Sequence, residues 1–444
     1  MFHRLSTWGP LGAALCIVAV SPLVAPTNAR AGNDEGVLFG SEASLTSGSV
    51  TATTSEGSAL WYNPAGLAAV SNGRLDVSGS AFMLRLYHVP QFLRTATGGG
   101  GPDANIAEIV SIPAAATYVR RLGPRVQFGA GIFVPVHGDY ILRASFITPS
   151  GSQWVNTITE QSDDTHAGVG VGLEVTPTLR IGTSFFGAYQ SSKGASQLLG
   201  GLASKAGMDS FASESSLRIF RAVSFEAGFG VQWAPLPALR LGAALRTPAV
   251  QVFQSTQLTD VSTAATPAAA TPSSKFEPVL VDNGAFRLGV VTPLKLRAGV
   301  AWLAGRASVA LDTDLTLPHV PKDDDVRALN WNVRAGARMR TRDDLAVGAG
   351  VFTDRSPFRD PSVQRERSLD FYGGTVGVEF GNTLTVSNGP APELSFATTL
   401  GLRYAYGTGE IKALQVDADG GIGSVPTTLT VHEIGVNIGS TLRF

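Results

Sequence analysis

The last strand-like segment of the chain alternates apolar residues with polar or small ones almost without interruption. One face carries Ile434, Val436, Ile438, Ser440, Leu442 and Phe444. The residues between them include Glu433, Asn437, Thr441 and Arg443. A period of two is typical of a strand whose two faces meet different surroundings. Strands of bacterial outer-membrane barrels have lipid on one face and a wet lumen on the other, and an aromatic last residue is usual there. The segment therefore predicts a transmembrane β-barrel.

The N-terminus indicates export. Arg4 precedes an apolar run from Leu11 to Val24, and Ala29-Arg30-Ala31 follows before a polar stretch. This order is typical of a secretory signal peptide, which we expect to be cleaved near Ala31. The single cysteine, Cys16, lies within the apolar run. The mature chain is then free of thiols, which suits an oxidising compartment.

Composition excludes two other classes of protein. Apolar residues make up 44% of the chain, yet no run after residue 31 approaches the roughly 20 residues of a membrane helix. The apolar residues must therefore be spread over alternating strands. Charged residues are only 16%, the net charge is -1 and there is no basic tract, so we expect no nucleic-acid partner.

Strand-like segments recur along the rest of the chain, and we find about 14, an even number as in single-chain bacterial barrels. Their approximate spans are 73–87, 111–121, 125–142, 165–176, 179–190, 219–234, 238–252, 285–303, 306–316, 329–340, 344–353, 369–381, 394–406 and 431–444. Tight connectors such as Thr176-Pro177-Thr178 alternate with long ones, except for a long link at 382–393. Barrels with short periplasmic turns and long outer loops have this rhythm.

The alternation also predicts which side chains face lipid. Leu239, Leu241 and Leu245 would meet lipid, whereas Arg240 and Arg246 would face the lumen. An arginine at mid-membrane on the lipid face costs roughly 2–4 kcal/mol, so the register is strongly determined. Charges of both signs then gather inside, where we expect most of them to form an ion network. They include Lys295, Arg297, Arg403, Glu174, Glu226, Asp312, Asp314 and Glu379.

The segment from Gly32 to about Asn72 does not alternate cleanly and is rich in Ser, Thr, Gly and Ala. A disordered periplasmic tail is one interpretation. The pair Trp61-Tyr62 beside a Pro-Gly turn favours a packed element, and a barrel of this width has a lumen to fill. The predicted organisation is a signal peptide at 1–31, a hatch or plug at 32–72, and a barrel at 73–444.

One motif resembles a known family. Residues 48–68, GSVTATTSEGSALWYNPAGLA, are similar to the hatch segment of the FadL family of outer-membrane transporters for long-chain fatty acids and other hydrophobic compounds. Residues 128–138, 239–248, 296–302 and 331–357 resemble the family in the expected order. The resemblance implies an all-β, antiparallel transmembrane barrel of about 14 strands, plugged by an N-terminal hatch. It also implies that ligand is captured outside and leaves sideways through an inward kink in the third strand.

The resemblance assigns candidate site residues. In the hatch they are Asn63, Pro64 and Ala65. In the third strand they are Phe128, Gly129, Gly131, Pro135 and Gly138. The residue types themselves favour a bend there, because proline cannot donate to a ladder and glycine weakens a strand. Glycine and proline near strand rims are also often harmless.

The connector at 191–217 reads as an outer loop with a short helical turn. Leu198, Leu199 and Leu202 fall on one helical face, and Met208 and Phe211 follow. Exposed apolar residues of this kind suit a first docking surface for a hydrophobic ligand. A loop that merely folds over the barrel mouth explains them equally well.

Catalytic and metal-binding patterns are missing from the sequence. The six histidines are isolated, there is no GxSxG elbow, and the Gly168–Gly172 run alternates with valine as a strand does. We expect no enzyme activity, no cofactor and no metal.

The predicted function is passive uptake of hydrophobic molecules in the outer membrane, by a monomer whose partners are small hydrophobic molecules and membrane lipids. Transfer from water to lipid is downhill by roughly 0.8 kcal/mol per methylene. The alternatives are a structural or secretion-associated scaffold of the same fold, an outer-membrane enzyme and a general porin. The sequence does not identify the cargo.

Overall fold

The computed structural model describes residues 37–70, 73–95, 103–147, 153–202, 210–265, 273–318, 327–357, 368–384, 394–416 and 422–444. The predicted signal peptide at 1–31 and Met208 lie outside these ranges, as does most of the connector at 382–393. Across the described ranges, no helix is both long and apolar enough to pass through a membrane.

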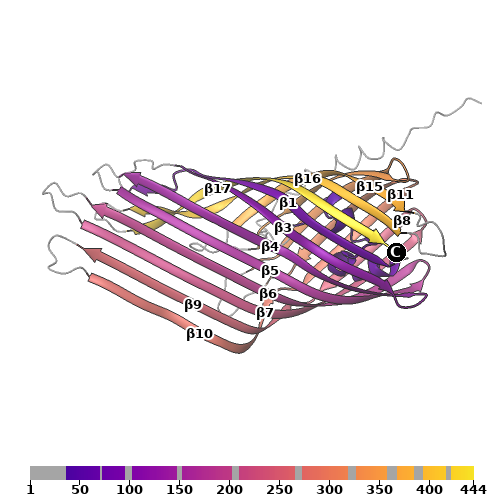
Figure 1. Ribbon diagram of the computed structural model, residues 1–444, viewed down its shortest axis with the longest axis horizontal. Helices are drawn as coiled ribbons and strands as arrows, with labels where there is room; N and C mark the ends of the chain where they lie inside the picture. Colours follow the sequence, from indigo (N-terminus) through magenta and orange to yellow (C-terminus); the bar gives the residue numbers. More distant parts are fainter. Residues whose placement is uncertain are drawn as a thin grey trace, which may run out of the picture.

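The chain folds into a closed antiparallel β-barrel, which confirms the predicted fold class (Figure 1). Its strands are β1 (Arg74–Val89), β2 (Leu93–Thr95), β3 (Ala104–Arg121), β4 (Val126–Ile147), β5 (Gln153–Thr176), β6 (Leu179–Leu202), β7 (Ser210–Leu236), β8 (Leu239–Arg246), β9 (Ala249–Ala265), β10 (Ser273–Thr292), β11 (Lys295–Ala304), β12 (Ala307–Thr316), β13 (Asn330–Arg340), β14 (Leu345–Asp354), β15 (Ser368–Leu384), β16 (Leu394–Val416) and β17 (Ile422–Arg443).

The barrel wall has 14 strands, as the alternation predicts. The short strand β2 is an addition on β16. Strands β8 and β9 follow one another directly around Pro248, and β10 and β11 do so around Pro293, so each pair acts as one strand of the wall. Proline lacks the N–H that a ladder uses, which explains the interruptions.

The first and last strands close the barrel. Strand β1 pairs with β17 from Arg74↔Arg443 onward, and the backbone N–H of Phe444 donates to the carbonyl of Gly73 at 2.9 Å. The ring of Phe444 stacks on Tyr118, with the ring centroids 6.3 Å apart. Figure 1 shows the C-terminus at the end of the barrel where the tight turns lie, which is the periplasmic end in outer-membrane barrels.

The two faces of the wall carry different kinds of side chain, apolar outside and polar inside, as the register requires. On β17, Ile434 and Ile438 point outward and are 42% and 44% exposed, whereas Glu433 and Asn437 are buried inside. On β13, Trp331 points outward and Arg334 is buried inside. The predicted lumenal ion network is present in pairs such as Arg297–Asp314, Arg403–Glu433, Arg246–Glu226 and Arg338–Glu379.

Strand length varies around the barrel. Strands β12, β13 and β14 have 10, 11 and 10 residues, close to the roughly 9–11 that cross a bilayer. Strands β5, β6 and β7 have 24, 24 and 27 residues. These three strands therefore exceed the length that crosses a bilayer and form a tall outer wall.

This outer wall corrects one prediction. The helical turn expected within 191–217 is wrong, because β6 and β7 pair without interruption as far as Leu202↔Ser210. Leu198, Leu199 and Leu202 lie in β6, and Phe211 lies in β7. Cross-strand pairing satisfies every backbone group of such an extension, whereas a single helical turn satisfies few. The helical spacing of the leucines therefore does not reflect a helix.

Residues 37–70, hereafter the inner segment, lie inside the ring of strands (Figure 1). They form helix α2 (Gly40–Leu45), helix α3 (Ala59–Tyr62) and the 3₁₀ helix η1 (Pro64–Ala69), and nearly all of them are buried. Helix α2 contacts β13–β17 and β1, and η1 contacts β4–β7. The segment therefore touches the wall on opposite sides of the lumen.

Candidate functional site

An aromatic cluster lies where the inner segment meets strands β4 to β6. It consists of Phe39 and Trp61 from the inner segment, Phe133 from β4 and Phe186 from β6. Ring centroids are 5.0 Å apart for Phe39–Trp61, 5.2 Å for Phe39–Phe133 and 5.8 Å for Phe133–Phe186. Edge-to-face contacts of this kind each contribute about 0.5–1.5 kcal/mol beyond simple burial. The cluster is therefore a tightly packed apolar contact between the inner segment and the wall.

The wall loses its strand pairing beside this cluster. Strands β3 and β4 pair from Arg121↔Gln127 to Ala115↔Phe133, and within the described strands the pairing ends there. Beyond that point β3 continues along β1, and β4 continues along β5. Phe133 is thus both the last β4 residue bonded to β3 and a member of the aromatic cluster. The pairing between β3 and β4 therefore ends at the aromatic cluster.

Two prolines explain why the pairing stops. Because Ala115 is opposite Phe133, continuing the register would set Pro113 opposite Pro135. Neither residue has a backbone N–H to donate. The β4–β5 ladder also shifts register between Phe133 and Val136, which gives β4 one extra residue, as in a β-bulge. Pro113 is a residue that sequence reasoning missed, because its role depends on the register of two strands.

The predicted kink residues fall on both sides of this irregularity. Pro135 lies within the bulge, whereas Phe128, Gly129, Gly131 and Gly138 pair regularly with β5. Gly129 serves packing instead, because a Cβ there would lie 3.0 Å from Leu67 of the inner segment. The irregularity in pairing is therefore located at the proline and not at the glycines.

The predicted hatch residues Asn63, Pro64 and Ala65 anchor the inner segment to the wall. The Asn63 amide donates to the carbonyls of Thr51 at 2.7 Å and Val231 at 3.0 Å, and its oxygen accepts from the Ala65 N–H at 3.2 Å. The Pro64 backbone approaches Gly182 so closely that a Cβ there would lie 2.3 Å from it. These three residues set the position of Trp61, two residues before Asn63.

Polar groups hold the other side of Trp61. The Arg246 guanidinium lies 3.8 Å from the centre of the indole and donates to the Trp61 carbonyl at 3.0 Å. Glu226 lies 3.5 Å from Arg246 and 3.3 Å from His166. A cation over an indole contributes about 0.5–2 kcal/mol. Trp61 is therefore held between an aromatic side and a charged side.

A second polar cluster joins the inner segment to the closing seam of the barrel. Arg74 of β1 pairs with Glu56 at 3.0 Å and with Asp76 at 2.6 Å. Glu56 also accepts from the backbone N–H groups of Ser41 and Glu42. Burial raises the pKa of Glu56 to about 8, and the nearby carboxylate of Glu42 acts in the same direction. Sequence patterns gave no sign of this cluster, because its members come from three separate segments.

The aromatic cluster is closed in this structure. The cavity that borders Trp61, Leu60 and Arg246 has a volume of about 20 Å³, which is room for one water. A larger molecule does not fit into this cavity.

The predicted docking residues other than Met208, which lies outside the described ranges, lie on the tall outer wall, away from the cluster. Leu199 is 40% exposed, and Leu198, Leu202 and Phe211 occupy β6 and β7.

Across the described residues, no three acidic, histidine or cysteine side chains gather as a metal site would require.

Comparison with family models gives no match, and comparison with curated protein sequences gives none either. Solved structures do match. A FadL homologue from Pseudomonas aeruginosa is 15% identical, with 95% of this chain and 99% of that chain covered and a TM-score of 0.55.

Two hydrocarbon channels are similar to the same extent. The toluene transporter TodX from P. putida is 15% identical, with 92% and 99% covered and a TM-score of 0.58. The monoaromatic hydrocarbon channel CymD is 14% identical, with 92% and 98% covered and a TM-score of 0.53. The resemblance to the FadL family is thereby confirmed for the fold, over nearly the whole chain.

Proposed function

We propose that this chain is an outer-membrane transport protein of the FadL type. It takes up hydrophobic molecules of the fatty-acid or hydrocarbon class, and the cargo leaves sideways through the wall between β3 and β4. The inner segment is the hatch of this channel. The proteins with the same fold are named as a FadL homologue, a toluene transporter and a monoaromatic hydrocarbon channel, which supports this class of cargo.

The observation that carries the proposal is the position of Phe133. It ends the β3–β4 pairing and belongs to the aromatic cluster that the inner segment completes. A molecule resting on this cluster is next to a part of the wall where Pro113 and Pro135 leave β3 and β4 unpaired. From there the bilayer is reached without crossing the periplasm.

The route needs no energy source. Each methylene that moves from water into lipid contributes roughly 0.8 kcal/mol, so net flow follows the concentration of the cargo outside. Because the cavity at the cluster is only about 20 Å³, the side chains of Phe39 and Trp61 must move aside during passage. The charged groups around Trp61 then serve to return it to its closed position.

Deletion of Pro135 tests the lateral route. Removing this residue eliminates the extra residue of β4, so the strand can pair regularly with β5 and approach β3. Uptake of labelled oleate and of labelled toluene by cells producing the variant is expected to fall to the level of cells without the protein.

The matched control is Pro135→Ala, which keeps the number of residues in β4 and therefore the bulge. This variant is expected to retain most of the uptake. Both proteins must show the heat-modifiable migration of a folded barrel in gel electrophoresis. Undiminished uptake by the folded deletion variant would show that cargo does not leave between β3 and β4.

A further inference from the structure

A second cavity lies at the tight-turn end of the barrel, away from the aromatic cluster. Its volume is about 210 Å³, well above the roughly 10–15 Å³ that one water needs. The wall supplies Arg180, Gln232 and Arg240, and the inner segment supplies Ala52 and Thr53. The cavity therefore opens near the periplasm and lies between the barrel and the inner segment.

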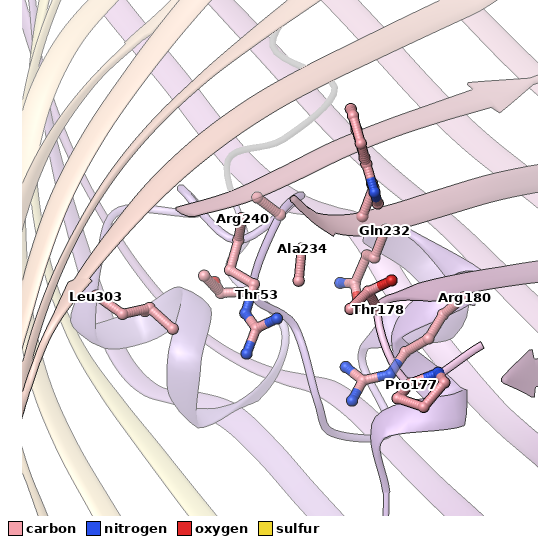
Figure 2. Close-up of a pocket in the computed structure, with 10 residues that line it drawn as sticks. Thr53, Pro177, Thr178, Arg180, Gln232, Ala234, Arg240 and Leu303 are labelled. Carbon is pink, nitrogen blue, oxygen red and sulfur yellow. The ribbon is translucent and has the colours of Figure 1, made fainter. Parts of the chain in front are cut away.

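Two arginines point into this cavity. Arg180 and Arg240 are each the second residue of a strand, β6 and β8, that starts from a tight turn. Figure 2 shows their guanidinium groups turned into the same space beside Thr53. Strand β7 runs between β6 and β8 and places Gln232 next to Arg180 in the register.

Neither guanidinium group forms an ion pair with a carboxylate in the described part of the chain. The Nε atom of Arg180 is buried and has no hydrogen-bond partner there. The nearest acid in the register is Glu174 on β5, opposite Arg180. It forms no ion pair with Arg180 among the described residues, although its charge acts on Arg180 electrostatically. Other lumenal arginines do have such partners, as Arg297 does with Asp314 at 3.0 Å.

Two like charges in a confined space repel one another, and a bound anion removes that repulsion. Guanidinium groups bind phosphate and carboxylate oxygens with two parallel hydrogen bonds. Thr53 and Thr178 line the same cavity, and a threonine hydroxyl can donate a hydrogen bond to an anion. The local chemistry is thus that of an oxyanion site.

We propose that Arg180 and Arg240 form a binding site for a phosphate group at the periplasmic end of the barrel. The bound group also ties the inner segment to the wall. The Gln232 amide already donates to the carbonyls of Thr51 at 3.4 Å and Thr54 at 3.2 Å, so the turn between these residues forms one side of the site. The site does not depend on which cargo the channel carries.

Calorimetric titration of the full chain in detergent, at low ionic strength, tests the site. One arm uses inorganic phosphate, a second uses short-chain phosphatidylglycerol, and sodium chloride is the ionic-strength control. Saturable binding is expected in at least one of the first two arms. Inorganic phosphate alone would identify a free anion as the ligand, and the lipid alone would identify a headgroup.

Arg180→Gln and Arg240→Gln are each expected to weaken this binding roughly tenfold. The matched control is Arg306→Gln, at another tight turn, where the side chain is 60% exposed and pairs with Asp343 at 2.9 Å. Arg240→Lys keeps the charge but not the two parallel hydrogen bonds, and is expected to retain more of the binding than Arg240→Gln. The site is refuted if neither phosphate compound binds saturably, or if Arg306→Gln weakens binding as much as the other two.

Discussion

Glu56 illustrates how much a single residue contributes when it joins separate parts of the chain. Its carboxylate meets the backbone of helix α2, the side chain of Ser58 and Arg74 of the first strand. Arg74 is also held closely by Asp76. One arginine thus serves two buried carboxylates, and Glu42 adds a third acidic group nearby. A proton on Glu56 relieves this excess of negative charge.

The raised pKa of Glu56 predicts a specific pH dependence. Because the pKa in the folded state, about 8, lies above the ordinary value of 4.5, protonation favours folding. This contribution is complete below pH 4.5 and is lost as the pH rises through about 8. Each pKa unit between the folded and the unfolded state changes the free energy of unfolding by about 1.4 kcal/mol. The thermal unfolding midpoint of the purified protein should therefore fall across this interval.

Replacing Glu56 by Gln should flatten this profile, since an amide does not titrate. It should also lower stability at acid pH by about 1–3 kcal/mol, because the amide satisfies fewer of the donors around it. Asp343→Asn is the control, because that carboxylate is 93% exposed. A profile that stays as steep in Glu56→Gln as in the wild type would assign the pH dependence to another group.

At the scale of elements, inward-facing glycines allow the inner segment to lie against the strands. Gly242 of β8 faces the backbone of Thr51 and Ala52, and Gly336 of β13 faces Thr46. Each places backbone against backbone where any side chain would intervene. The high glycine content of the chain, 51 residues, is therefore partly a requirement of packing inside the barrel.

Gly242→Ala should displace the inner segment, because the added Cβ would lie 2.3 Å from the Thr51 carbonyl and 2.6 Å from Ala52. Overpacking of this kind typically costs about 1–3 kcal/mol. The expected results are a lower thermal midpoint and faster cleavage of the inner segment by added protease.

The matched control is Gly194→Ala in β6, where a Cβ would meet nothing within 4 Å. It should leave both measurements unchanged. Equal behaviour of the two variants would mean that the contact at Gly242 does not hold the inner segment in place.

At the scale of the whole molecule, the inner segment occupies the lumen that 14 strands enclose. It is held by apolar contacts at the aromatic cluster and by polar contacts at the seam and at Asp312, whose carboxylate accepts from the Thr51 N–H at 2.7 Å. These contacts lie on different sides of the barrel. Movement of one end of the segment is therefore compatible with attachment of the other.

The filled lumen predicts that the intact protein conducts few ions. In planar bilayers the wild type should show no steady open channel, and deletion of the inner segment, residues 37–70, should produce one, because the polar inner wall then becomes a continuous water path. A gel assay of heat-modifiable migration checks that the deletion variant still folds. Steady conductance by the wild type would contradict the proposal of a hatch and favour a porin.

Much of the architecture was determined by the sequence alone. Alternation along β17 and β8, and tight turns such as the one at Pro177, predicted the barrel, the number of strands and the face that each side chain occupies. Such patterns are local, because a strand between lipid and water needs the correct residue at every second position. The NPAGL run likewise led to the correct fold.

Other features were decided only by the tertiary structure. The end of the β3–β4 pairing depends on which residue faces Pro135, and the seam at Glu56 and the arginine pair at Arg180 depend on segments far apart in the chain. The leucines of β6 looked helical because spacing alone does not reveal that β7 lies alongside them. Contacts between distant segments arise from register and closure of the whole barrel, and no local pattern in the chain encodes them.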